Sequence, residues 1–398
     1  MAASRTIIVA GAGIGGLTAS LALARQGFRV IVLEKAPRLE EIGAGLQLSP
    51  NASRVLVDLG LRPRLSQAVT PDAISLMNAR SGVEITQIPL QTAAFDADAP
   101  YWVIHRADLQ AALRAEVENS PDIDLRLGCQ FEDASSHAKG LTVIQRSGVA
   151  RQEELAMMLV GADGIWSAVR GVLFPEAQPH FAGLIAWRGT LEAKQVPREY
   201  TARRVQLWMG PNAHLVAYPI AGARQINVVA VVPGHWNRPG WSEAGDGNEI
   251  KSEFASARWH AIPRMLLGAV DGWQKWALFA IPGGGEWTHC ATALLGDAAH
   301  AMLPFAAQGA AMAIEDAAVL AKCIAERKSE GPVATSAALA RYARLRRPRV
   351  VRMQRHARQA GRIYHLSGPL ALARDLMIKA LGPNRMLARQ DWIYDWRA

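Results

Sequence analysis

Cysteines and long apolar runs are scarce in this sequence of 398 residues, and each scarcity argues against a class of protein. The three cysteines, Cys129, Cys290 and Cys323, are too few and too scattered for a disulfide framework or a zinc-binding pattern, so we expect no metal site and a reducing cytoplasm. No apolar run reaches the roughly 18 residues of a bilayer-spanning helix, and the stretch from Ile7 to Ala10 is too short for a signal-peptide core. Hydrophobic residues make up 50% of the chain and charged residues 20%, as in a folded globular protein.

Acidic residues are missing from one segment. Nine arginines and no acid lie between Arg341 and Arg362, and this excess equals the net charge of +9 of the whole chain. Several recur at intervals of three and four residues, which predicts a solvated face of a helix. Steering of anionic cofactors or substrates, and nucleic-acid or membrane association, are alternatives. We expect no nucleic-acid partner and no stable membrane insertion, because interleaved aromatic residues and a known nucleic-acid motif are missing.

The hydrophobic pattern divides the chain into an α/β part and a β-rich part. The first 34 residues predict a strand, a glycine turn, a helix and a second strand, which together form a βαβ unit. Between Phe181 and Val232, short β-rich runs separated by turn signals predict an antiparallel sheet. A strand and a long helix follow from Ala291, and the stretch from Gly234 to Asn248 is expected to be a mobile loop. The predicted strands are Thr6–Ala10, Arg29–Leu33, Leu184–Leu191, Val205–Met209, His214–Ile220, Gln225–Val232 and Ala291–Leu295, and the predicted helices are Leu17–Gln26, one from about Asn51, Ala107–Asn119 and Ala310–Arg327.

The first strand runs into the motif Gly11-Ala12-Gly13-Ile14-Gly15-Gly16, a GxGxxG that opens the first helix. Gly11 permits the tight turn, Gly13 lets a pyrophosphate approach the helix N-terminus, and Gly16 allows close packing of helix and strand. Glu34, followed by Lys35, closes the second strand 18 residues after Gly16, where an acid bonds a ribose. We therefore predict a dinucleotide site.

Two later motifs identify a family. Gly161-Ala162-Asp163-Gly164 follows an apolar run, and Gly296-Asp297-Ala298-Ala299-His300 follows the strand that ends at Leu295. Together with the glycine turn, they resemble the three fingerprints of the group A flavoprotein monooxygenases, the single-component FAD-dependent aromatic hydroxylases. The resemblance covers nearly the whole chain, and the motifs occur in the family's order.

The resemblance implies roles for particular residues around a bound FAD. Asp297 would bind the ribityl chain, Asp163 would lie in a segment that serves both FAD and nicotinamide binding, and Arg106 matches an arginine near the FAD. A helix that begins near Gly309 and Ala310 would place its positive end toward the anionic reduced flavin. An Asp that follows Gly is also commonly an ordinary turn residue or helix cap.

The resemblance also implies the reaction. Group A enzymes reduce FAD with NAD(P)H, form a flavin hydroperoxide with O₂, and transfer one oxygen atom to an electron-rich ring. We therefore expect hydroxylation of a small phenolic or hydroxylated N-heteroaromatic acid, with or without decarboxylation, and NADH as the more favoured reductant. A monooxygenase or dehydrogenase acting on a bulkier polycyclic substrate is the alternative. The sequence leaves a monomer and a homodimer equally open.

A phenol reacts more readily once deprotonated, so the site profits from a base near the substrate hydroxyl. His214 and Tyr218 are four residues apart on a predicted strand, so they face the same side about 13 Å apart and can bracket one aromatic ring. This pair is similar to the His and Tyr of hydroxylases of 3-hydroxybenzoate and 6-hydroxynicotinate. Gln47 and Gln308 are further candidates to line the ring pocket. No arginine is evidently placed to bind a carboxylate.

The predicted fold is α/β: a Rossmann-like FAD-binding domain with an inserted β-sheet substrate domain and a C-terminal helical region. The expected segments are 1–75, 101–180 and 276–360 for the FAD-binding domain, 76–100 and 181–275 for the substrate domain, and 361–398 for the helical region.

Overall fold

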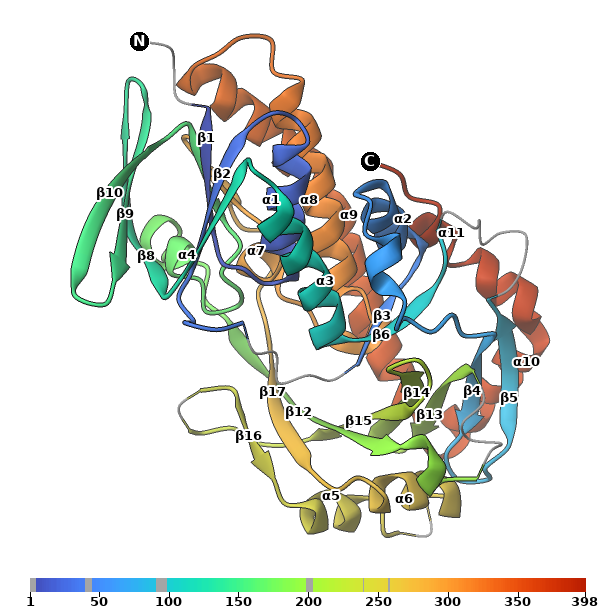
Figure 1. Ribbon diagram of the computed structural model, residues 1–398. Coiled ribbons are helices and arrows are strands. Elements are labelled where there is room, and N and C mark those ends of the chain that lie inside the picture. Colours follow the sequence, from blue (N-terminus) through green and yellow to red (C-terminus); the bar gives the residue numbers. More distant parts are fainter. Residues whose placement is uncertain (1–4, 40–44, 91–98, 198–202, 239, 257) are drawn as a thin grey trace.

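The computed structural model describes residues 5–39, 45–90, 99–197, 203–238, 240–256 and 258–398. Its first part is built on a six-stranded sheet in the order β18-β19-β11-β1-β2-β7, parallel except for β18 at one edge. Helices α1, α3, α8 and α9 pack along one side of this sheet (Figure 1). The strands are β1 (Thr6–Ala10), β2 (Arg29–Glu34), β7 (Ile123–Leu127), β11 (Met158–Gly161), β18 (Thr288–His289) and β19 (Thr292–Leu294), and the helices are α1 (Ile14–Ala24), α3 (Arg106–Asn119), α8 (Gly309–Ala325) and α9 (Pro332–Tyr364).

A three-stranded antiparallel sheet, β8 (Cys129–His137), β9 (Gly140–Ser147) and β10 (Ala150–Ala156), covers the other side. Its apolar side chains, among them Phe131 and Val143, join the main hydrophobic core. Short helix α4 (Ala168–Leu173) follows β11. The parallel sheet is therefore buried on both faces, which explains why its strands are continuous apolar runs rather than alternating ones.

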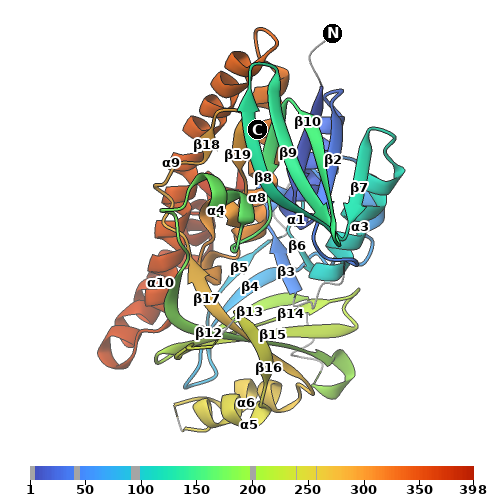
Figure 2. The same ribbon diagram turned by 90° about the vertical axis from the view of Figure 1, so that its left-hand side faces the viewer.

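The second part is an eight-stranded sheet in the order β16-β17-β12-β15-β14-β13-β4-β5. Helices α5 (Gly247–Glu253) and α6 (Ala261–Gly268) cover its lower face, and the upper face points toward the first part (Figure 2). A separate core that contains Trp187, Trp208 and Phe254 fills the space on the helix side. The strands are β4 (Ala73–Asn78), β5 (Glu84–Pro89), β12 (His180–Glu192), β13 (Arg204–Gly210), β14 (Ala213–Ile220), β15 (Gln225–Pro233), β16 (Ser242–Gly245) and β17 (Trp273–Ala280).

Short elements and the C-terminal helices join the two parts. The ribbon of β3 (Gly45–Leu48) and β6 (Trp102–His105) descends toward the large sheet, and α10 (Gly368–Ala388) packs against β5 (Figure 1). The remaining elements are α2 (Pro50–Asp58), α7 (Asp297–His300), α11 (Asp391–Tyr394) and the 3₁₀ turns η1 (Arg62–Leu65), η2 (Ala193–Gln195) and η4 (Pro304–Ala306). Among the described residues, no helix is both long and apolar enough to cross a membrane.

This architecture confirms the predicted α/β fold with its β-sheet insertion and helical C-terminal region. The predicted loop from Gly234 to Asn248 is partly wrong, because Ser242–Gly245 forms the edge strand β16 and α5 begins at Gly247. Four of the expected segment borders, 75/76, 180/181, 275/276 and 360/361, fall inside β4, β12, β17 and α9, so secondary structure runs across them.

The prediction of one solvated arginine face is also wrong for two of the nine arginines of α9. Arg346 is 1% exposed and pairs with Glu315 and Asp316, while half-buried Arg349 also pairs with Glu315. The two acids lie on α8, far from the arginines in sequence. Spacing along one helix did not reveal that part of its basic face packs against acids of a neighbouring helix.

Candidate active site

One cavity of about 300 Å³ lies where the two parts meet. Its wall on the first part includes the glycine turn and the start of α8, and its wall on the second part is the upper face of the eight-stranded sheet. Eight of the predicted site residues line it directly: Gly13, Gln47, Arg106, His214, Tyr218, Asp297, Gly309 and Ala310. The cavity thus brings together motifs that are up to about 300 residues apart in the sequence.

The glycine turn has the shape that a dinucleotide site requires. Gly11 has φ +104°, and a Cβ there would lie 2.5 Å from the carbonyl oxygen of Ala162. A Cβ on Gly16 would lie 1.9 Å from the oxygen of Gly11, so close packing excludes any side chain. A Cβ on Gly13, in contrast, would meet nothing within 4 Å, although Gly13 lines the cavity. The space beside Gly13 at the α1 N-terminus fits the pyrophosphate of FAD.

Glu34 and Lys35, at the end of β2, differ in their position relative to the glycine turn. The carboxylate of Glu34 accepts hydrogen bonds from the N–H groups of Ala12 (2.9 Å) and Ala36 (2.8 Å), one on each oxygen. These bonds hold the carboxylate beside the glycine turn, and each oxygen retains capacity for a ribose hydroxyl. Lys35 is exposed and is not among the residues that line the cavity, so its cofactor role stays a prediction.

Asp297 and Asp163 occupy contrasting positions. Asp297 is the exposed first residue of α7 within an otherwise buried run, and its carboxylate lines the cavity. An acid so placed fits a ribityl hydroxyl of FAD. Asp163 does not line the cavity; its Oδ2 accepts bonds from the N–H groups of Ala168 and Val169 at the start of α4. Burial raises the pKa of Asp163, and the residue stabilises the turn that carries its cavity-lining neighbour Gly164.

Opposite these motifs, strand β14 presents alternate residues to the cavity. His214, Val216 and Tyr218 line it, whereas Ala213, Leu215 and Ala217 pack into the core on the other face. The predicted common orientation of His214 and Tyr218 is therefore confirmed, because successive side chains of a strand point to opposite faces.

His214 is 3% exposed and shares a hydrogen bond with His365, with Nδ1 and Nε2 2.8 Å apart. The rings of Phe305 and Tyr364 also pack against it. Burial first, and the neighbouring His365 second, lower the pKa of His214 to about 3, so its imidazole is neutral at neutral pH. Burial likewise lowers the pKa of His365 to about 4. A neutral His214 whose Nδ1 donates to His365 retains Nε2 as a proton acceptor.

Strand β3 packs closely against the ring of Tyr218 at Gly45. Gly45 of β3 approaches its ring so closely that a Cβ there would lie 2.6 Å from Cε2 of Tyr218, and the Gly45 N–H donates to Oδ1 of Asn227 at 2.7 Å. Burial raises the pKa of Tyr218, so it remains a phenol that can donate a hydrogen bond. Nearby, the hydroxyl of Tyr101 donates to Oε1 of Gln47 at 2.7 Å, which fixes the orientation of the Gln47 amide.

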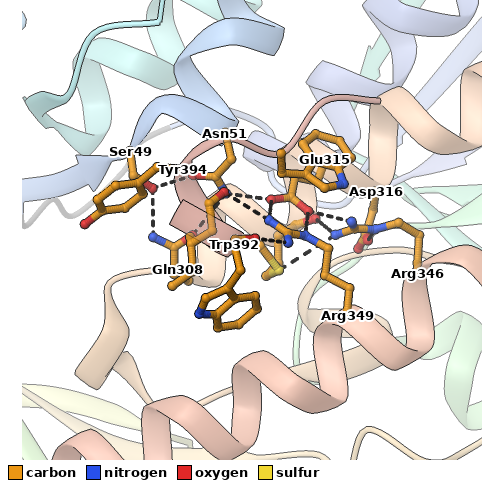
Figure 3. Close-up of polar contacts among 12 residues, drawn as sticks. Ser49, Asn51, Gln308, Glu315, Asp316, Arg346, Arg349, Trp392 and Tyr394 are labelled. Atoms are coloured by element: carbon orange, nitrogen blue, oxygen red, sulfur yellow. Dashed lines mark hydrogen bonds and ion pairs between the residues drawn. The ribbon is translucent and has the colours of Figure 1, made fainter. Parts of the chain in front are cut away.

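Gln308 lies behind the cavity rather than in its wall. It is buried, its Nε2 donates to Ser49, and its Oε1 accepts from Asn51 (Figure 3). Asn51 also donates to Glu315, which joins this group to the arginines of α9. Gln308 is not among the residues that line the cavity, so a direct role toward substrate stays a prediction.

Comparison with known proteins accords with this geometry. A family model described as an FAD binding domain matches residues 4–357. The chain belongs to the group A FAD-dependent aromatic hydroxylases. It is 34% identical over 399 residues to a 3-hydroxybenzoate 6-hydroxylase of Klebsiella oxytoca, with 100% of this chain and 98% of the relative covered. It is 35% identical to 3-amino-4-hydroxybenzoate 2-monooxygenase PtnB3 of Streptomyces platensis, covering 98% and 96% of the two chains. The solved structure of a salicylate hydroxylase substrate complex superposes with a TM-score of 0.82, at 25% identity and 99% and 96% coverage.

FAD is therefore the cofactor of this hydroxylase, as the glycine turn, Asp297 and the start of α8 indicate by their shape and chemistry. The resemblance of the three sequence motifs to the family is confirmed. The predicted function of an FAD-dependent aromatic monooxygenase is confirmed with it.

Two residues of the site, His365 beside His214 and Arg188 in the cavity wall, escaped the sequence analysis of this hydroxylase. His365 follows α9 and carries no motif, so no signal in the sequence marked it. Arg188 lies on β12 and lines the cavity. The sequence did mark Arg188, because a charged residue in the middle of an apolar strand is unusual unless it has an oppositely charged partner or binds a ligand.

Proposed function

We propose that this hydroxylase acts on a small phenolic or hydroxylated N-heteroaromatic acid, and that His214 is its base. The observation that carries the proposal is the position of His214 and Tyr218 on one strand face, opposite the residues that fit FAD and in the same cavity. Bound FAD takes reducing equivalents from a nicotinamide and activates O₂. Val216, between the two polar residues, offers an apolar surface for the substrate ring.

His214 accepts the proton of the substrate hydroxyl at Nε2 and passes its own Nδ1 proton to Nε2 of His365. This transfer fits the low pKa of His214, since a charged imidazolium is unfavourable at its buried position. His365 is the less buried of the two and is the exit toward solvent. Tyr218 donates its hydroxyl proton in a hydrogen bond and orients the ring, while the fixed amide of Gln47 closes the far side.

The balanced reaction consumes one aromatic substrate, one O₂, one NADH and one proton, and yields the hydroxylated product, NAD⁺ and water. NADH is our proposed reductant in preference to NADPH, and the cytoplasm, which supplies it, is the proposed location. All three cysteines are unpaired, which is compatible with a reducing compartment. Attack at a carboxylated ring carbon would release CO₂ in place of a proton.

The decisive experiment is a screen of hydroxybenzoates and hydroxynicotinates for stimulated NADH oxidation, with the product identified by mass spectrometry. We expect at least one acid to stimulate NADH consumption and to gain one oxygen atom from ¹⁸O₂. The same assay with NADPH in place of NADH tests the choice of reductant, and we expect faster oxidation of NADH. Hydroxylation only of polycyclic substrates, or oxidation without oxygen incorporation, would contradict the proposal.

A further inference from the structure

Arg188 is a cation of the cavity wall that has no anionic partner among the described residues. Strand β12 carries it between β15 and β17, opposite Val229 on one side and Gln274 on the other. Within the described residues its guanidinium makes no hydrogen bond or ion pair, and its Nε is buried and unsatisfied. Its side-chain contact is the ring of Trp276, whose centroid lies 5.9 Å from the guanidinium carbon.

A guanidinium that is shielded from water and has no partner destabilises the folded protein, because its charge loses hydration without gaining hydrogen bonds. Burial lowers the pKa of Arg188, which shows that its surroundings disfavour the charge. An arginine nevertheless stays protonated at neutral pH and presents five N–H donors in a planar fork that matches a carboxylate. The buried arginines of the described chain all have partners: Arg346 bonds Glu315 and Asp316, Arg170 bonds two backbone carbonyls, and Arg374 pairs with Asp375. Arg188 is therefore expected to receive its anion from a ligand.

The sheet register places this cation opposite the predicted base. Val229 of β15 pairs with Arg188 on one side and with Val216 of β14 on the other, so these three residues form one row across the sheet. Neighbouring strands are about 4.8 Å apart, so Arg188 stands about 10 Å from the point midway between His214 and Tyr218. Val229 and Val216 lie between and line the cavity. A ring lying on these valines has a hydroxyl partner at one end and a guanidinium at the other.

We propose that Arg188 is a specificity-determining residue that binds the carboxylate of the aromatic acid through a charge-assisted, bidentate contact. The inference rests on the proposed function only for the presence of an aromatic acid. It adds the residue that selects acids over neutral phenols.

The test measures binding rather than turnover. The FAD-loaded enzyme is titrated calorimetrically with benzoate and with benzamide, which have the same ring but differ in charge. We expect benzoate to bind the wild type more tightly, and Arg188→Gln to weaken benzoate binding about 10- to 100-fold while benzamide changes less than about 3-fold. Arg188→Lys retains the positive charge but loses the planar fork of donors, so its affinity for benzoate is expected to lie between those of the wild type and Arg188→Gln. Arg264→Gln, at an exposed position of α6 under the same sheet, is the matched control and should alter neither affinity.

Several outcomes would overturn the inference. These are equal weakening of both ligands, unchanged benzoate binding in Arg188→Gln, or a wild type that does not prefer benzoate. If Arg188→Gln does not fold with FAD, Arg188→Lys carries the test by the same comparison of the two ligands. Benzoate has no ring hydroxyl, so its binding is independent of hydroxylation. Arg188-dependent benzoate binding without turnover of any phenolic acid would uphold the anion site and reject the proposed function. Turnover of phenolic acids by an enzyme that binds benzoate no more tightly than benzamide would uphold the proposed function and reject the anion site.

Discussion

At the scale of single residues, His214 lies between the cavity and His365 in the proposed path of the proton. Its Nδ1 bonds His365, whereas its Nε2 has no partner in the described part of the chain, and the residue lines the cavity. In the proposed mechanism His365 is a positioning residue, since it would act on the substrate only through His214. The His214–His365 pair is therefore expected to affect two properties that can be measured separately, the rate of hydroxylation and the stability of the fold in acid.

Replacing His214 with Asn should lower kcat about 10²- to 10⁴-fold and leave FAD bound, because the proton acceptor is lost while the cofactor contacts remain. Stopped-flow and steady-state hydroxylation assays across pH measure this loss, and the flavin spectrum measures occupancy. His365→Asn should lower kcat less and change the pH profile, since it blocks the exit of the proton rather than its acceptance. Undiminished hydroxylation by His214→Asn at every pH would remove His214 from the base role.

The same pair should make the protein sensitive to acid. Both histidines have folded-state pKa values, about 3 and about 4, below the unfolded value near 6.5, so the unfolded chain binds more protons in between. Their contribution is fully present above pH 6.5 and is lost as pH falls toward 4, by up to about 1.4 kcal/mol per pH unit for each histidine. Urea unfolding from pH 7 to 4.5 measures the slope. His214→Asn should flatten it, and an unchanged slope would contradict the buried neutral pair.

Asp297→Asn should weaken FAD binding at least about tenfold, because a neutral amide accepts the bonds of a ribityl hydroxyl less strongly than a carboxylate. Asp58→Asn, at an exposed position outside the cavity wall, is the matched control. Reconstitution of the apoprotein, followed by the quenching of flavin fluorescence, gives both dissociation constants. Equal FAD affinity in the two variants would contradict the assignment of Asp297.

At the scale of elements, the approach of β3 to β14 depends on Gly45. A side chain there would collide with the ring of Tyr218, 2.6 Å from Cε2, so Gly45→Ala should displace the ring and lower both Tm and substrate affinity. Gly268→Ala is the control, because a Cβ on this residue near the end of α6 meets nothing within 4 Å. Differential scanning calorimetry and substrate titration measure both effects. A Gly45→Ala variant that matches the Gly268→Ala variant in both would show that the close contact is dispensable.

At the scale of the whole molecule, the α8–α9 interface is held by a buried charge network. Arg346 pairs with Glu315 and Asp316, and Arg349 also pairs with Glu315 (Figure 3). His300 is a further partner of Asp316. Burial alone would raise the pKa of Asp316, but its interactions with His300 and Arg346 lower that pKa to about 2. The network also reaches Asn51 and Gln308 behind the cavity, so it connects the long C-terminal helix with the flavin side of the site.

Arg346→Met should therefore lower the free energy of unfolding by about 3–5 kcal/mol, because it leaves two buried carboxylates short of a partner. Arg344→Met, at an exposed position of the same helix, should change stability by less than about 0.5 kcal/mol. Guanidinium unfolding of the two variants in parallel checks the difference. Equal stability would mean that the remaining partners, His300 and Arg349, compensate for the loss.

The sequence by itself determined the local features of this hydroxylase. Spacing of apolar residues and glycines predicted β1, α1 and β2, because a strand, a tight turn and a helix start depend on neighbours within a few residues. The two-residue period of a strand likewise placed His214 and Tyr218 on one face. Three short motifs identified the family, and with it FAD.

Only the tertiary structure decided which distant residues meet. His365 joins His214 across 151 positions, Arg346 turns inward to acids of another helix, and Arg188 faces the cavity through the register of three strands. Gln308, equally plausible from sequence as a cavity residue, bonds Ser49 and Asn51 instead. The physical reason is that a buried polar side chain takes its partners from whatever elements pack against it, and the pattern along its own strand or helix does not contain that information.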